Sequence, residues 1–416
     1  MAMKPARRLL TAAFAALTLT ATAACGAAED DTSKKPVNAA AVLGPSAPAK
    51  GEPVRIGVVT GKAATGQRAV ERDVAEATIK YLNARKSGIG GRPIELFVCD
   101  TTADPSTATD CANRMIQDRV AGVVIGSTSV AESVWDPLHA AGIPTMLFAA
   151  SDAPVLRDAK STFVLSDPVF ANVTLPIELA KDADEKTVTT IVVDVPTAVG
   201  LYSTVAPPVY AKAGIEHTVI AVPLDTADMT PQLQKLAKGD PGIVHVVGND
   251  SFCVAAFSGL RAVGFTGKIH AAGPCITDAT RKATPKDQLE GMTVSAATPL
   301  GTDNPSMQLY EAVAATYGKD IDLGSPAGMS LFSTITAFHA ALQNLTGEVT
   351  PQSVTAAIKA APKAEMPGAQ PLTFQCNGSF YPATPAVCLR GGLIATLDEK
   401  GKPEKYDARG TEPAGS

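Results

Sequence analysis

The chain alternates short apolar runs with segments of helix length, and this alternation constrains the fold more than any other feature. In the first half, the runs lie at 54–59, 94–98, 120–125 and 143–148. They are rich in Val and Ile and lack alternating polar residues, which is typical of strands buried on both faces. After the first run, apolar residues recur at helical spacing at Val70, Val74, Ala77 and Tyr81. The pattern predicts a parallel sheet covered by helices.

The same alternation begins again in the second half of the chain. Its apolar runs lie at 188–193, 217–222, 243–247 and 268–272. A third section follows, with helical segments at 305–317, 328–345 and 351–360 and a last strand at 393–397. The chain from about residue 53 is long enough for two domains. The repeat therefore predicts two doubly wound α/β lobes, and the late elements predict that the chain crosses between them more than once.

Ligands of open parallel sheets bind beyond the carboxyl ends of the strands. Six loops occupy that place, at 60–69, 126–130, 149–154, 194–200, 248–252 and 273–277. The first has the glycine spacing of a phosphate-binding loop, but Gln67 and Arg68 stand where that loop needs Lys and then Ser or Thr. Its glycines, Gly61 and Gly66, either turn the backbone at the mouth of a cleft or form a plain tight turn.

The N-terminus has the pattern of an export signal. Residues 1–24 combine Lys4, Arg7 and Arg8 with an uncharged stretch that is too short and too rich in Ala and Thr to span a bilayer. Small residues before Cys25 resemble a bacterial lipobox, which implies lipidation of Cys25; an ordinary secretion signal is the alternative. The stretch 25–52 has no periodic apolar face, and we expect it to be a lipid anchor and flexible tether.

The charge of the chain argues against a nucleic-acid partner. Removal of the signal takes away three basic residues and no acidic ones, which changes the formal net charge at pH 7 from −5 to −8. Binding to nucleic-acid phosphates requires clustered Lys and Arg. We therefore expect a different class of partner.

Six cysteines remain besides Cys25. An even number in an exported chain indicates disulfides, although six cysteines allow fifteen connectivities. We predict that neighbours in the sequence pair, because each such pair closes a short loop: Cys99–Cys111, Cys253–Cys275 and Cys376–Cys388. A metal site is the competing interpretation, but there is no CxxC motif and the five histidines are scattered.

From residue 53 onward the sequence resembles the extracytoplasmic solute-binding proteins of ABC transporters, in particular the branched-chain amino-acid-binding type. The likeness is carried by "VRIGVVTG", "GIGGRPIELFVCDTTADPSTATDCANRMIQD", "VAGVVIGSTSVAESVWDPLHAAGIPTMLFAASDAPVL" and "VFANVTLPIELAKD". It implies the type I periplasmic-binding-protein fold, in which two Rossmann-like lobes are joined by a three-crossover hinge. The implied lobes are 53–166 with 297–382 and 167–296 with 383–410.

The resemblance also implies ligand contacts in the first lobe. The family's loop "GPxSS" matches 126–130 and includes Ser127, Thr128 and Ser129, while Val130 replaces the second serine. The family's loop "SPAAT" matches 148–152, with Ala150, Ser151 and Asp152. Asp152 stands where a Thr hydroxyl is usual; a carboxylate there suits a cation or a hydroxyl-rich ligand, and capping of the turn before Pro154 is its alternative role.

In the second lobe the sequence departs further from the family. Val199 stands in place of an aromatic residue, and Tyr202 is close enough to substitute for it. Cys275 occupies the position of the acidic residue that neutralises the ligand amino group. Asn249 and Asp250 follow a strand and can supply polar contacts, with a solvated loop as the alternative.

Together these observations predict a monomeric, lipid-anchored extracytoplasmic receptor for a small polar ligand, an amino acid or similar molecule, that serves an ABC permease. No catalytic residue, metal or cofactor is expected, because the sequence contains no GxSxG, HExxH or P-loop lysine. Two alternatives stay open. A lobe pair of this kind can signal to a membrane partner, and a secreted α/β hydrolase can use a site without a known motif.

Overall fold

The computed structural model describes residues 39–61, 70–102, 104–301 and 303–412. The predicted signal, Cys25 and most of the loop at 60–69 lie outside the described residues. Within the predicted tether, α1 (Ala39–Leu43) packs against the first lobe, and Leu43 is only 2% exposed. The prediction of a tether up to residue 52 is therefore wrong for its last part, because Leu43 is buried in an apolar core.

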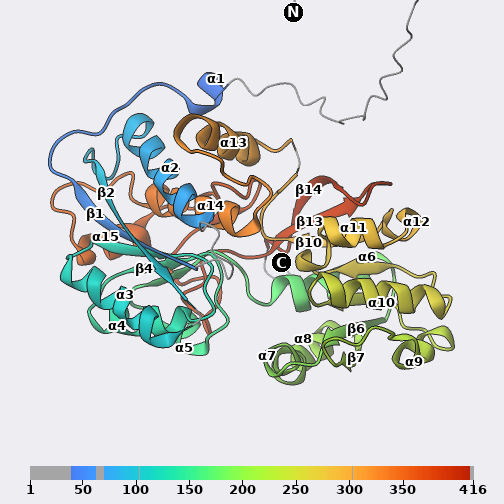
Figure 1. Ribbon diagram of the computed structural model, residues 1–416. Helices are drawn as coiled ribbons and strands as arrows, with labels where there is room; N and C mark the ends of the chain where they lie inside the picture. The colour runs from blue at the N-terminus through green and yellow to red at the C-terminus, as the bar shows by residue number, and fades with distance from the viewer. Residues whose placement is uncertain (1–38, 62–69, 103, 302, 413–416) are drawn as a thin grey trace, which may run out of the picture. The chain divides into compact units, whose positions relative to one another are not determined.

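The first sheet has the order β2-β1-β3-β4-β5, and all its strands are parallel. Helices α2, α13 and α14 cover one face, and α3 and α4 cover the other (Figure 1). Most residues of β1 are buried, as expected for a strand between two helical layers. The elements are β1 (Val54–Gly61), β2 (Ile94–Thr101), β3 (Gly122–Ile125), β4 (Thr145–Leu147), β5 (Thr162–Val164), α2 (Val70–Arg85), α3 (Pro105–Gln117), α4 (Ala131–Ala140), α13 (Pro305–Tyr317) and α14 (Pro326–Ala341).

The second sheet has the order β14-β13-β10-β9-β8-β6-β7. Strands β6 to β10 are parallel, whereas β13 and β14 return as antiparallel strands at one edge. Helices α6 and α8 cover one face, and α9 and α10 cover the other. The elements are β6 (Thr187–Val193), β7 (Glu216–Val222), β8 (Ile243–Val247), β9 (Ile269–Ala271), β10 (Thr293–Ala296), β13 (Gly392–Leu397), β14 (Pro403–Arg409), α6 (Leu175–Asp182), α8 (Ala206–Ala213), α9 (Thr230–Leu233) and α10 (Asp250–Ala262).

Several helices begin with a capping side chain followed by proline, a combination that favours helix initiation. The capping residues are Asp104 for α3, Asn304 for α13, Ser325 for α14 and Thr350 for α15. The remaining elements are α5 (Ala153–Arg157), α7 (Pro196–Gly200), the π-helical segments η1 (Phe170–Thr174) and η2 (Leu201–Val205), the 3-10 turns η3 (Gln234–Ala237) and η4 (Gly273–Cys275), α11 (Asp278–Ala283), α12 (Lys286–Leu289), α15 (Pro351–Ala360), β11 (Ala364–Glu365) and β12 (Thr373–Phe374).

The chain passes between the two sheets three times: after β5, after β10 and before β13. The last passage comes later than the expected return to lobe 2 at residue 383. Val164 of β5 donates its N–H to Ala386 and accepts from the N–H of Cys388, so this segment extends the first sheet. The backbone hydrogen bonds of residues 386–388 thus place the passage between residue 389 and β13.

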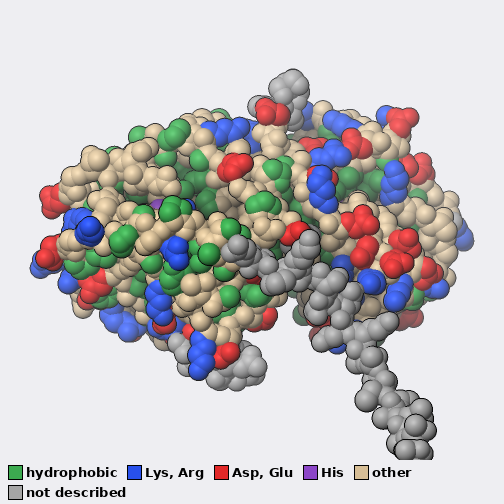
Figure 2. All heavy atoms as spheres, turned by 90° about the horizontal axis from the view of Figure 1, so that it is seen from above, with side chains coloured by type: hydrophobic (Ala, Val, Ile, Leu, Met, Phe, Trp, Pro, Cys, Tyr) green, Lys and Arg blue, Asp and Glu red, His purple; other side chains and the backbone are tan. Residues whose placement is uncertain are grey.

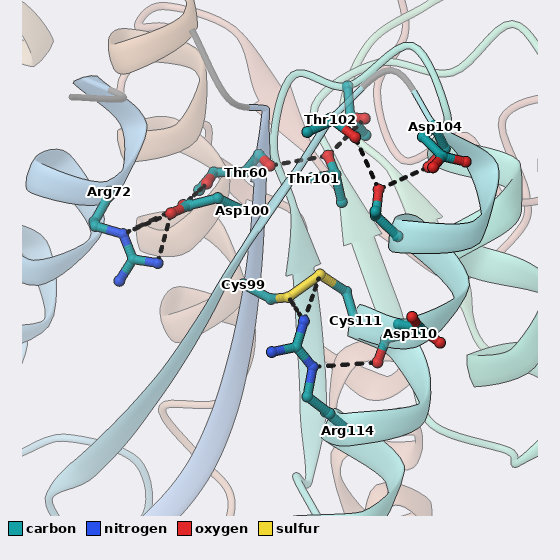
Figure 3. The surroundings of a disulfide bond; sticks show 12 residues. Thr60, Arg72, Cys99, Asp100, Thr101, Thr102, Asp104, Asp110, Cys111 and Arg114 are labelled. Atoms are coloured by element: carbon teal, nitrogen blue, oxygen red, sulfur yellow. Dashed lines mark hydrogen bonds and ion pairs between the residues drawn. A yellow bond between two sulfur atoms is a disulfide. The ribbon is translucent and has the colours of Figure 1, made fainter. Parts of the chain in front are cut away.

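The three disulfides are those predicted from the sequence. Cys99–Cys111 joins β2 to α3, and the Arg114 guanidinium lies 2.9 Å from Cys99 Sγ (Figure 3). Cys253–Cys275 joins α10 to η4, and Cys376–Cys388 fixes the segment beside β5. Each bond therefore links two segments of the same lobe.

On the face shown in Figure 2, Lys and Arg side chains are interspersed with Asp and Glu. The described residues include no helix that is both long enough and apolar enough to cross a membrane.

Candidate functional site

A cavity of about 1040 Å³ lies at the carboxyl ends of the strands of both sheets. Five of the six loops selected from the sequence contribute to its wall, through Thr128, residues 149–152, Ala198, Gly248 and residues 273–274. This position agrees with the rule that ligands of doubly wound sheets bind beyond the strand ends.

A buried glutamate holds the loop that follows β3. Glu71 of α2 is 4% exposed, and its carboxylate accepts the N–H groups of Gly61, at 3.1 Å, and of Ser127, at 2.7 Å. Burial raises the pKa of this carboxyl group, and the two backbone N–H groups oppose that effect. A Cβ on Gly126 would lie 2.7 Å from the Glu71 carboxylate, so a larger residue there would displace that carboxylate. Glu71 thereby fixes the ends of β1 and β3 relative to each other.

A second polar network supports the same loop (Figure 3). Arg72 pairs with Asp100 at 2.8 Å, and Asp100 accepts the hydroxyl of Thr60 at 2.6 Å. Thr101 donates to the Thr60 carbonyl and lies 3.0 Å from the hydroxyl oxygen of Thr128. These bonds connect the outer strand β2 to the cavity wall.

Four predicted residues of the first lobe line the cavity: Thr128, Ala150, Ser151 and Asp152. The Thr128 hydroxyl also accepts the N–H of Val130 at 3.3 Å. Ser127, Ser129 and Val130 are not part of the lining; Val130 is the residue before α4 and provides no side-chain cap.

Asp152 precedes α5, but its side chain accepts no hydrogen bond from the start of that helix. Pro154 lacks an N–H, which removes one of the two donors that a side chain in this position normally uses. Within the described parts of the chain, the Asp152 carboxylate makes no hydrogen bond or ion pair, and it lies half-buried in the cavity wall. The alternative role as a turn cap is therefore not seen.

In the second lobe, Tyr202 lies in the cavity wall and is 3% exposed. Its hydroxyl has no hydrogen-bond partner among the described residues, and burial raises its pKa. Tyr202 belongs to η2, and both η1 and η2 line the cavity. Such π-helical segments are often found at functional sites.

Asn249 and Asp250 do not line the cavity. The Asn249 side chain caps α10 by accepting the N–H of Phe252 at 3.0 Å. Asp250 accepts a hydrogen bond from Thr277 at 3.3 Å. Both side chains thus have local structural contacts.

The part of the wall formed by residues 165–172 and by eight residues between 366 and 392 was not predicted from the sequence. Asp167 lies on the first passage between the sheets and is 9% exposed. Its carboxylate accepts the hydroxyl of Tyr381 and the N–H of Gly391, the latter at 3.2 Å. Burial raises the pKa of Asp167, although these donors oppose the shift. Asp167 thus connects the first and third passages, and nothing local in the sequence indicates this contact.

The cavity wall is mainly apolar. Within the part of the chain that the structure describes, its only charged side chains are Asp152 and Asp167; Lys, Arg and His do not contribute. The same part contains no group of three or more His, Cys, Asp or Glu side chains placed to hold a metal ion. The site is therefore suited to binding an organic molecule.

Comparison with protein families gives one match. The family described as periplasmic binding protein matches residues 53–388, which include the first sheet and strands β6 to β10 of the second. This is a family of solute-binding proteins. A search of curated protein sequences found no match.

Solved structures show the same fold at low sequence identity. An ABC transporter substrate-binding protein from Sphaerobacter thermophilus has a TM-score of 0.66 and 20% identity, over 87% of this chain and 97% of that one. The isoleucine complex of LivJ from Streptococcus pneumoniae has a TM-score of 0.61 and 14% identity, over 86% and 99%. An R. palustris solute-binding protein in complex with 4-hydroxybenzoate has a TM-score of 0.65 and 16% identity, over 87% and 98%.

Proposed function

The chain belongs to the periplasmic binding protein family, and from this premise we propose that it is a lipid-anchored extracytoplasmic receptor for an ABC importer. It captures a small polar organic ligand, an amino acid or a similar molecule, between its two lobes. The observation that best supports this proposal is the cavity of about 1040 Å³, whose wall combines strand-end loops of both sheets. The lipobox-like sequence before Cys25 supports the anchor.

The proposed mechanism is ligand-dependent closure. A ligand that contacts both lobes only in a closed form stabilises that form by its difference in affinity between the two states. The permease then recognises the closed lobe pair. Asp167 and Gly391 lie in the passages between the sheets, where such a movement would bend the chain, and Tyr381 of the first lobe donates its hydroxyl to Asp167.

The cavity and the related proteins support this ligand class. One similar structure contains isoleucine and another contains 4-hydroxybenzoate, both small organic molecules with a polar group. The wall of this chain likewise combines apolar residues with a few polar ones, including Thr128, Ser151 and Asp152. We therefore propose that the present chain also binds a small organic molecule of this kind.

A thermal-shift screen of the purified protein tests this function. The panel contains amino acids, polyamines, sugars, short-chain amides and purines. A ligand present at a hundred times its dissociation constant stabilises a protein by about 2.7 kcal/mol. We expect stabilisation by an amino acid or a related amine; stabilisation by none of these classes would contradict the proposed receptor function.

A further inference from the structure

The charge of the cavity limits the kind of ligand that it can hold. Its described wall contains two carboxylates and no basic side chain. Asp167 accepts hydrogen bonds from Tyr381, Gly391 and Val169, so protein donors already occupy it. Asp152 has no such donor among the described residues. One carboxylate is therefore left for the ligand.

Asp152 is placed to bind a positively charged group. It stands at the end of the β4 loop and in the cavity wall, with its capping function unused. A half-buried carboxylate is stabilised most by a charged donor, because charge-assisted hydrogen bonds are about twice as strong as neutral ones. An ammonium group on the ligand supplies such a donor.

The neighbouring loop, which follows β3, offers little to a ligand carboxylate. Val130 has no hydroxyl, and the hydroxyl of Thr128 already contacts Thr101 and the Val130 N–H. The first turn of α4 contains Glu132, whose negative charge already complements the helix dipole. A ligand carboxylate would also be repelled by Asp152. These features disfavour an anionic or zwitterionic ligand.

The remaining wall suits an apolar body. Phe148, Leu165, Phe170, Leu201, Val205 and Leu389 all contribute to it. The cavity volume, about 1040 Å³, is at the upper end of the range for sites that hold drug-sized ligands. The wall therefore has room for an aromatic or branched aliphatic group next to the ammonium.

We propose that the ligand of this cavity is an organic amine with an apolar body and no carboxylate, whose ammonium group pairs with Asp152. This inference rests on the proposed receptor function and narrows its ligand class. The amine retains the amino group and side chain of an amino acid and lacks its acid group.

Three probes with one apolar body test the proposal: 3-phenylpropylamine, 3-phenylpropan-1-ol and 3-phenylpropionate. Their dissociation constants are measured by titration calorimetry on the purified full-length protein at pH 7. We expect the amine to bind at least about ten-fold more tightly than the alcohol, as for a charge-assisted hydrogen bond. The propionate should bind more weakly than the alcohol.

Two variants test whether the Asp152 carboxylate is responsible for the preference for the amine. Asp152→Asn keeps the shape of the side chain and should reduce the affinity for the amine to that for the alcohol. Asp136→Asn removes an equal charge from the exposed side of α4, outside the cavity wall, and should leave the amine affinity unchanged.

Two results would overturn the inference: an amine that binds no more tightly than the alcohol, or full amine affinity in Asp152→Asn. Preferential binding of 3-phenylpropionate would also overturn it, while supporting a solute receptor of another specificity. The thermal-shift screen tests the receptor function independently of the amine specificity, because it includes ligands without an amino group.

Discussion

At the scale of single residues, the cavity depends on side chains that position its loops. Glu71 is the best example, since its carboxylate accepts one backbone N–H from the end of β1 and one from the loop after β3. Both N–H groups lie near the cavity, where an unpaired donor is costly. Sequence reasoning did not identify Glu71, because an acidic residue in the first turn of a helix is ordinary.

Glu71→Gln tests this positioning role. The amide has one oxygen, so one of the two N–H groups loses its acceptor and faces an NH₂ group instead. We expect a loss of about 1–3 kcal/mol in unfolding free energy, measured by urea denaturation. Glu399→Gln, at an exposed turn position, is the control. Equal stability of the two variants would show that Glu71 does not hold the loop.

At the scale of elements, the second sheet contains two buried histidines on the neighbouring strands β8 and β9, His245 and His270, and a half-buried one on β7, His217. The rings of His245 and His270 stack at a centroid distance of 5.0 Å, and His217 stacks on Tyr210 at 3.9 Å. His245 has no hydrogen-bond partner among the described residues. Burial lowers the pKa of His217 to about 4 and of His270 to about 3, and it places the pKa of His245 well below the usual value.

These lowered pKa values predict acid sensitivity. The unfolded chain binds protons at its histidines near pH 6.5, before the folded protein does, so stability is lost as the pH falls below that value. Each such histidine contributes up to about 1.4 kcal/mol per pH unit. His245→Phe should remove one of the protons that the unfolded chain binds. The unfolding free energy, measured by urea titration from pH 7 to 4.5, should therefore depend less steeply on pH in this variant. An unchanged slope in the variant would contradict this explanation.

The disulfide Cys376–Cys388 holds a segment that contributes Tyr381, Thr384 and, directly after it, Leu389 to the cavity wall. Replacement of both cysteines by alanine should lower the unfolding free energy by about 3 kcal/mol, from the entropy of a short closed loop, and should weaken ligand binding. Removal of Cys99–Cys111 is the matched control, because its sequence separation is also 12. Its loss should lower stability similarly but spare affinity; equal affinities of the two variants would contradict the proposed role.

Most elements could be predicted from periodicity, including the three-residue strands β4 and β9, but β5, β10 and β14 were not predicted. β5 and β10 contain three and four residues and each begins with Thr, which shortens the apolar run, and β14 is a largely exposed edge strand with four charged residues. The strand-end rule led to Thr128 and residues 150–152 in the cavity wall, and the family resemblance led to Tyr202. It did not lead to residues 165–172 or 366–392, because passages of the chain between the sheets bring them there and no local pattern marks them.

At the scale of the whole molecule, the three passages between the sheets form the hinge that the proposed mechanism requires. Asp167 links the first passage to the third, and the Phe170 ring packs against Gly392 and Gly410. A Cβ on either glycine would lie within 2.6 Å of that ring, so a side chain at either position would displace Phe170. In the proposed mechanism, the two lobes move as units about these passages.

Small-angle X-ray scattering of the purified protein, with and without a ligand found in the thermal-shift screen, tests the central claim most directly. Capture between two lobes predicts that a saturating ligand lowers the radius of gyration, because it stabilises a more closed form. A saturating ligand that leaves the radius of gyration unchanged would contradict the closure mechanism.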